Sequence, residues 1–182
     1  MSASEVLRRI TALLDHAGIP YMLTGSLASA HYGVPRSTLD IDVVIAANPE
    51  QLRKFVHSLP SDEYYADLEA GLQAHHRQSM FNVIDLANGW KIDLIIRKSR
   101  LFSQERRQVV NVQGLRLVVA SPEDVIIAKL EWSKLSESKR QVEDVAAILR
   151  ARPESLDQIY LEKWIRELGL EKEWGDAQTA AI

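Results

Sequence analysis

The sequence has no cysteine among its 182 residues, which excludes disulfide bonds and thiolate metal sites. No apolar run approaches the roughly 18 residues that a membrane-spanning helix needs. Residues 1–16 have an amphipathic pattern rather than the continuous apolar stretch of a signal peptide. An excess of positive charge is also missing, since the formal net charge is -3, and this argues against a general coat protein for nucleic acid. These absences favour a cytoplasmic protein with no membrane partner.

The remaining composition is that of a globular protein with a core, because 46% of the residues are hydrophobic and 26% are charged. Apolar residues at helical spacing predict helices at residues 4–16, 27–32, 49–58 and 62–76. Runs of branched aliphatic residues predict strands at 20–24, 39–45, 80–86, 90–96, 109–112 and 115–119. Further helices are predicted at 122–135, 139–150 and 156–168. We therefore expect an α+β fold, in which helices flank a mixed β-sheet core and a helical C-terminal segment follows.

Three aspartates lie where a buried strand would carry apolar side chains. In the run Leu39–Ile45, strand alternation places Asp40 and Asp42 on one face, about 6–7 Å apart. Asp93 lies in a similar run, Trp90–Ile96, and would converge with them if the two strands were neighbours. Carboxylates this close in an apolar setting repel one another unless a cation neutralises them. Mg²⁺ suits such hard oxygen ligands, and polymerases use carboxylates around two metal ions.

The aspartate pair has a second interpretation, in which Asp40 begins its strand in solvent and Asp42 pairs with Arg36. The Gly25-Ser26 step favours the metal site, because it lies on a predicted strand-to-helix turn. Glycine lets the backbone approach a phosphate, and the start of a helix presents N–H groups and a favourable dipole. Ser26 could also cap that helix, a role that is compatible with phosphate binding.

The order and spacing of these motifs resemble those of the nucleotidyltransferase (polymerase β-like) superfamily: Gly25-Ser26, a spacer, Asp40-Ile41-Asp42 and a later Ile92-Asp93-Leu94. The stretch GVPRSTLDIDVVI further resembles small bacterial proteins of the abortive-infection type (AbiEii-like). The segments SPED and SKRQVEDVAAIL, with Lys129 between them, resemble the C-terminal helices of that group. One departure is Gln141, which stands where many toxin members carry an aspartate.

The resemblance implies a reaction in which a nucleoside monophosphate moves from an NTP to an acceptor and pyrophosphate is released. Asp40, Asp42 and Asp93 would be the catalytic residues and would bind two Mg²⁺ ions, for which Mn²⁺ could substitute. Residues 1–120 would form the nucleotidyltransferase catalytic core, residues 121–174 a helical segment packed on it, and residues 175–182 a frayed tail.

The same resemblance assigns nucleotide contacts. Gly25 and Ser26 would contact the β- and γ-phosphates. Lys129 lies in an otherwise apolar helical run, so it either extends its ammonium to solvent or points at phosphate; phosphate is the favoured role. The other candidate residues for nucleotide binding are Arg36 and Thr38, and the candidate supporting residues are Arg140 and Asp144.

The acceptor stays open at this point. Arg97, Lys98, Arg100, Arg106 and Arg107 follow Asp93 closely, and they could hold the triphosphate, bind an RNA acceptor such as tRNA, or form a solvated face. An RNA-directed toxin would have a cognate antitoxin as its partner. The alternatives are an antibiotic-type small-molecule or protein nucleotidyltransferase, and an inactive nucleotide-binding partner module. The oligomeric state is likewise open.

Overall fold

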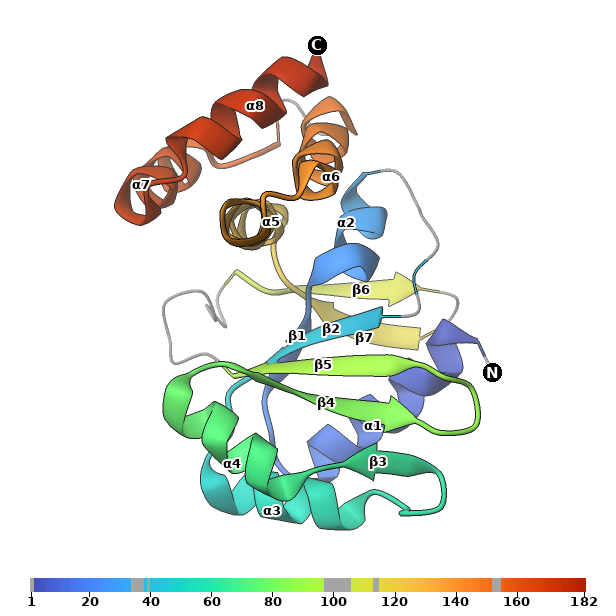
Figure 1. Cartoon of the computed structure of the whole chain (residues 1–182). Helices are drawn as coiled ribbons and strands as arrows, with labels where there is room; N and C mark the ends of the chain where they lie inside the picture. The colour runs from blue at the N-terminus through green and yellow to red at the C-terminus, as the bar shows by residue number, and fades with distance from the viewer. Residues whose placement is uncertain (1, 34–37, 39, 97–105, 113–114, 152–154) are drawn as a thin grey trace. The chain divides into compact units, whose positions relative to one another are not determined.

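The computed structural model describes residues 2–33, 38, 40–96, 106–112, 115–151 and 155–182, and Figure 1 shows the course of the chain. The chain divides into two compact units. The first unit consists of residues 1–24 and 38–119, and the second unit consists of residues 25–37 and 120–182. The second unit thus joins the C-terminal helices with a segment that a simple division at residue 120 would leave in the catalytic core.

The first unit is built on a mixed β-sheet. Its described strands are β1 (Tyr21–Leu23), β2 (Asp40–Ile45), β3 (Tyr64–Ala66), β4 (Met80–Asp85), β5 (Lys91–Ile96), β6 (Gln108–Val112) and β7 (Leu115–Val119). Their order across the sheet is β3-β4-β5-β2-β1-β7-β6. β2 pairs with β5 and β1 with β7 in parallel, whereas the other neighbours are antiparallel. The strands that carry the predicted aspartates, β2 and β5, therefore lie side by side within the sheet (Figure 1).

One face of this sheet forms the core of the first unit. The described helices of the unit are α1 (Ala3–His16), α3 (Pro49–Ser58) and α4 (Leu68–Arg77). α4 packs closely on β4, because a methyl group at Gly71 would lie 3.4 Å from the ring of Phe81. Phe81 shares its face with Leu94 of β5 and Val43 of β2, and the latter two side chains are completely buried. Burial of these apolar side chains is the main stabilising term for the unit.

The turn between β4 and β5 is held by Asp85. Its carboxylate accepts hydrogen bonds from the backbone N–H groups of Ala87 at 3.0 Å and Asn88 at 2.9 Å, and from the Asn88 side chain. Gly89 has φ +71°, a left-handed conformation that glycine adopts without steric cost. The predicted hairpin at this position is confirmed, and its turn determines which residues of β4 lie opposite β5.

The second unit is helical, and its described helices are α2 (Gly25–Tyr32), α5 (Pro122–Ser136), α6 (Lys139–Ala151), α7 (Gln158–Leu168) and α8 (Glu171–Ala181). α2 packs against α5 and α6. The Tyr32 hydroxyl donates to the carbonyl oxygen of Ala120 at 2.8 Å, and a methyl group at Gly33 would lie 3.2 Å from the backbone of Ala147. These contacts attach α2 to helices that come much later in the sequence.

The predicted α+β class, with a mixed sheet and C-terminal helices, is confirmed. Three details were predicted wrongly. The helix expected at 62–76 begins only at Leu68, because Tyr64–Ala66 pairs with β4 as a strand. The tail expected to fray at 175–182 lies mostly in α8, where Ala177 is fully buried. The helix that Ser26 was expected to cap begins one residue earlier, at Gly25.

The described part of the chain contains no helix with the length and apolar character needed to cross a membrane.

Candidate active site

The three predicted aspartates share one face of the sheet. Asp42 of β2 lies opposite Asp93 of β5 in the parallel register, and Asp40 lies opposite Lys91 one step away on the same face. Adjacent strands are about 4.8 Å apart, so Asp42 and Asp93 are immediate neighbours. The pairing of β2 with β5 therefore brings the three aspartates onto one face of neighbouring strands, and their role as a metal site stays a prediction.

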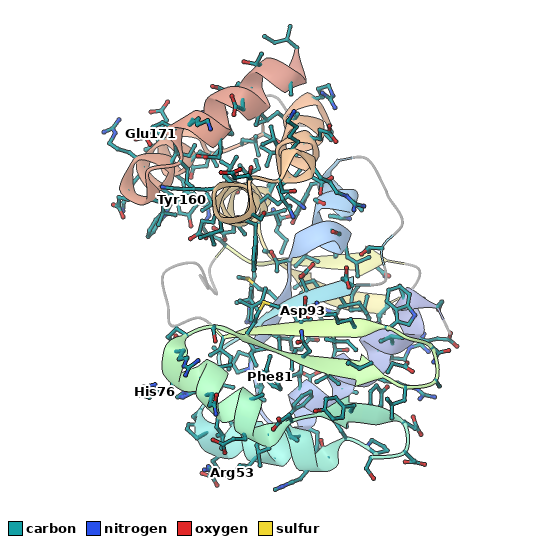
Figure 2. The ribbon with its side chains drawn as sticks, in the orientation of Figure 1. Arg53, His76, Phe81, Asp93, Tyr160 and Glu171 are labelled. Atoms are coloured by element: carbon teal, nitrogen blue, oxygen red, sulfur yellow. The ribbon has the colours of Figure 1, made fainter. Side chains whose placement is uncertain are left out.

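This polar face is the one that α4 does not cover. Asn82 of β4 lies opposite Asp93, whereas the next residue back, Phe81, lies opposite Leu94 and points to the core. Figure 2 shows Asp93 and Phe81 on opposite sides of the strands. The first unit thus presents carboxylate, amide and ammonium groups on one side of the three neighbouring strands β2, β5 and β4 and apolar groups on the other.

Asp93 is the most enclosed of the three carboxylates, since the residue is only 6% exposed. Its Oδ2 atom accepts a hydrogen bond from Lys91 Nζ at 2.9 Å. Its Oδ1 atom accepts a hydrogen bond from the side-chain amide of Asn82. A buried charge is tolerated when it is paired and hydrogen-bonded, and both conditions are met here.

Lys91 lies within electrostatic reach of the whole group. Its hydrogen bond to Asp93 raises the pKa of the Lys91 ammonium, and the negative charges of Asp93, Asp40 and Asp42 act in the same direction, whereas partial burial opposes them. All three aspartates therefore act on one ammonium group. Their combined effect on the pKa of Lys91 indicates that the negative potentials of the three carboxylates overlap.

The donor set has the chemistry that Mg²⁺ requires, because carboxylate oxygens are its preferred protein ligands. These carboxylates do not form a complete coordination site. Among the described residues, no three His, Asp or Glu side chains approach closely enough to hold a metal ion. Asp93 also has contacts of its own. Both of its oxygens are engaged by neighbouring side chains, so a metal ion would have to exchange with one of those contacts.

The Gly25-Ser26 step follows directly after the end of β1. The Thr24 N–H group donates to the carbonyl oxygen of Asp42 at 2.9 Å, so β1 ends beside the aspartate of β2. Gly25 has φ +62°, which requires glycine or a residue that tolerates the left-handed region. Gly25 and Ser26 begin α2 in the second unit, and Ser26 is buried within that unit's helix.

Among the loop residues proposed to bind nucleotide, Thr38 has a local role. Its hydroxyl accepts the Asp40 N–H at 3.1 Å and so orders the start of β2. Arg36 lies outside the described residues, as do Arg97, Lys98 and Arg100 of the basic segment. The three interpretations of that segment, as a triphosphate contact, an RNA-binding segment or a solvated face, therefore all stand as predictions.

Lys129 is part of a buried ion pair in the second unit. Its ammonium lies 2.7 Å from Asp144 Oδ2 and 3.0 Å from Gln141 Oε1, and the residue is 2% exposed. The interpretation that Lys129 extends its ammonium group into solvent is therefore wrong. Asp144, a candidate supporting residue, is thus the partner of Lys129, whereas Arg140 is exposed on α6.

Two residues of the polar face, Lys91 and Asn82, were missed from the sequence. The signal for Lys91 was its position two residues before Asp93, which places both on one face of the strand. Asn82 had no comparable signal, because its place opposite Asp93 depends on a loop of residues 86–89, longer than a two-residue Asn-Gly turn.

Comparison with known families identifies the class of this protein. The chain belongs to the family described as "Nucleotidyltransferase of unknown function (DUF6036)", which it matches over residues 4–178. Membership of the nucleotidyltransferase superfamily is thereby confirmed, and the AbiEii-like subtype stays a prediction. No curated protein matches the chain.

Solved structures share the fold at low sequence identity. An antigenic nucleotidyltransferase-like protein from Paracoccidioides brasiliensis has a TM-score of 0.58 and 15% identity, over 98% of this chain and 91% of that one. The antibiotic-resistance factor ANT(2'')-Ia has a TM-score of 0.56 and 14% identity, over 92% and 94%. The lincosamide antibiotic adenylyltransferase LnuA has a TM-score of 0.55 and 16% identity, over 78% and 93%. The chain therefore has a nucleotidyltransferase fold along most of its length.

Proposed function

We infer that this protein is a Mg²⁺-dependent nucleotidyltransferase that moves the nucleoside monophosphate of an NTP onto an acceptor. The observation that carries this proposal is the pairing of Asp42 with Asp93 on one polar face that also holds Asp40. Membership of a nucleotidyltransferase family supports it, because such clustered carboxylates are what nucleotidyl transfer requires.

The chain's own residues would act mainly by positioning and electrostatics. Asp40, Asp42 and Asp93 would hold the metal ions, which when bound neutralise the triphosphate and lower the pKa of an attacking hydroxyl. Asn82 holds one oxygen of Asp93 and so limits rotation of that carboxylate. Gly25 and Ser26, with the N–H groups at the start of α2, would bind phosphate oxygens.

Two classes of acceptor have support. RNA, with tRNA as the example, is supported by the basic residues after Asp93 and by the resemblance to AbiEii-like toxins. In that case a cognate antitoxin is the expected partner. A small molecule is supported by the fold shared with ANT(2'')-Ia and LnuA, whose names describe antibiotic resistance and antibiotic adenylylation. A third possibility, an inactive nucleotide-binding module, is disfavoured because Asp40, Asp42 and Asp93 are all present on one face.

The test uses the full chain with each α-³²P-labelled NTP, Mg²⁺ and either total RNA or a panel of aminoglycosides and lincosamides. We expect label to move onto an acceptor with release of pyrophosphate. Label in small RNA identifies an RNA acceptor, and label in small molecules identifies the antibiotic type. Nucleotide binding by calorimetry without any pyrophosphate release identifies the inactive module and overturns the enzyme assignment.

The matched control is a pair of aspartate variants. Asp42→Asn should abolish transfer while the circular dichroism spectrum stays unchanged, because removing one of several repelling charges does not unfold a sheet. Asp62→Asn changes an exposed aspartate of the first unit and should leave transfer as in the parent protein. Full activity in Asp42→Asn would reject the metal site proposed here.

A further inference from the structure

Lys91 lies on the carboxylate face beside Asp93. It lies opposite Asp40 and two residues before Asp93, and its ammonium is 2.9 Å from Asp93 Oδ2. The Lys91 side chain is 43% exposed, whereas that of Asp93 is 9% exposed. The lysine can therefore swing out to solvent while the carboxylate stays in place.

The two contacts of Asp93 differ in how easily they can be exchanged. Asn82 is a short side chain on β4, directly opposite Asp93, and its amide holds Oδ1. Lys91 reaches Oδ2 with a long and flexible side chain from the same strand. The oxygen that can be released for another cation is therefore Oδ2, and the group that must leave is the Lys91 ammonium.

Charge neutralisation gives the lysine its role. Three carboxylates on one face of neighbouring strands repel one another, and the cost is greatest for the enclosed Asp93. One ammonium at hydrogen-bonding distance offsets part of that repulsion. The same positive charge would oppose a divalent cation that approached the same oxygen.

We propose that Lys91 is the resident counter-cation of the carboxylate face, which stabilises the metal-free protein and must be displaced from Asp93 when a divalent cation binds. This inference rests on the proposed metal site and adds a role for a residue outside the ligand set. Lys91 is a positioning residue in this scheme, since it acts through the Asp93 carboxylate. It makes the protein stable without metal and makes metal binding weaker than the three aspartates alone would allow.

The test is Mn²⁺ binding to the full chain, measured by electron paramagnetic resonance of free Mn²⁺ and by calorimetry. Lys91→Met should bind Mn²⁺ about tenfold more tightly than the parent protein, because one nearby positive charge is removed. Lys91→Arg keeps the charge and should bind within about twofold of the parent. Lys54→Met removes a positive charge from α3, on the other side of the sheet, and should also leave the affinity within about twofold.

A second readout follows Lys91 directly. In ¹H–¹⁵N spectra of the side-chain ammonium groups, the hydrogen-bonded Lys91 signal should be resolved in the metal-free protein and should be lost when Mg²⁺ is added. Without metal, Lys91→Met should have a lower Tm than the parent protein, and Mn²⁺ should raise its Tm by a larger amount. A role in fold stability alone would lower the Tm equally with and without metal.

The outcomes separate this inference from the function on which it rests. Equal or weaker Mn²⁺ binding by Lys91→Met, with binding by the parent protein abolished in Asp42→Asn, overturns the role of Lys91 and leaves the metal site intact. No Mn²⁺ binding by the parent protein overturns the metal site and the counter-cation role together. Tighter binding by Lys91→Met, with Lys91→Arg near the parent, supports both.

Discussion

Asp42 and Asp93 lie opposite each other on the parallel strands β2 and β5, although α3, β3, α4 and β4 separate those strands in the sequence. Because parallel strands run in the same direction, residues at corresponding positions of the two strands lie side by side. The register decides the outcome, because a slip by one residue would turn one aspartate into the core. The chemistry proposed for this protein therefore depends on how accurately the sheet sets that register.

The Asn82 amide should be a positioning group for Asp93. Asn82→Ala removes the hydrogen bond to Oδ1, and hydrogen bonds to charged groups contribute roughly 1.5–3 kcal/mol. We expect kcat to fall about tenfold or more, since an unheld carboxylate spends less time in a productive orientation. The measurement is steady-state pyrophosphate release at saturating NTP.

The control for Asn82→Ala is Asn111→Ala, which changes an exposed asparagine of β6 and should leave kcat unchanged. An Asn82→Ala protein that keeps the parent kcat would show that Asp93 is oriented by other groups. A rise in KM with kcat unchanged would instead point to a change in nucleotide binding.

Asp85 should stabilise the hairpin on which this register depends. Asp85→Ala leaves the N–H groups of Ala87 and Asn88 without their acceptor, and we expect the free energy of unfolding to fall by about 2 kcal/mol. Asp85→Asn keeps an oxygen that can accept both hydrogen bonds and should lose less than half of that amount. Urea unfolding followed by circular dichroism measures both variants, and equal losses would mean that the charge of Asp85 matters more than its hydrogen bonds.

The sequence predicted the local parts of this site well, for identifiable reasons. Asp40 and Asp42 stand out because strand alternation applies to any strand, whichever neighbour it has. The β4–β5 hairpin follows from the Asn88-Gly89 step, since only a few residue pairs suit a tight turn. The parallel pairing of β2 with β5 has no comparable local signal, because it depends on the path of the whole chain between them.

The elements that were missed have weak local patterns. β3 has only three residues, which are too few for an alternation of apolar and polar side chains to be recognised. α8 begins at Glu171 after the N-cap residue Leu170, which makes no side-chain cap hydrogen bond, and it contains Gly175, which lowers its intrinsic helix propensity. Its stability comes from packing, as the complete burial of Ala177 indicates. Lys91 was missed because a lysine in a strand is usually a solvated residue.

The Lys129–Asp144 pair should contribute mainly to stability. Lys129→Met leaves Asp144 partly buried without its ammonium partner, and breaking such a pair costs about 3 kcal/mol or more. The double variant Lys129→Met/Asp144→Leu removes both charges and should recover much of that loss. Chemical denaturation of the three proteins measures the effect. A double variant that is as unstable as the single one would mean that the pair has further essential contacts.

The same variants examine the phosphate role predicted for Lys129. If the ammonium also binds nucleotide, the double variant should recover stability but keep a raised KM for NTP. If the ion pair is structural only, KM and stability should recover together. The comparison is informative because Lys129 already contacts both Asp144 and Gln141 within the second unit.

Gly25 should have two separable roles, one in backbone conformation and one in phosphate binding. Its φ of +62° makes Gly25→Ala unfavourable by about 1 kcal/mol, whereas asparagine tolerates this conformation better. Gly25→Asn should therefore have a Tm closer to that of the parent protein than Gly25→Ala has. Both variants carry a side chain where a phosphate would approach the backbone, so both should raise the KM for NTP about tenfold or more. Thermal unfolding and pyrophosphate release measure the two properties independently. Recovery of KM together with Tm in Gly25→Asn would mean that the glycine serves the conformation of the turn alone.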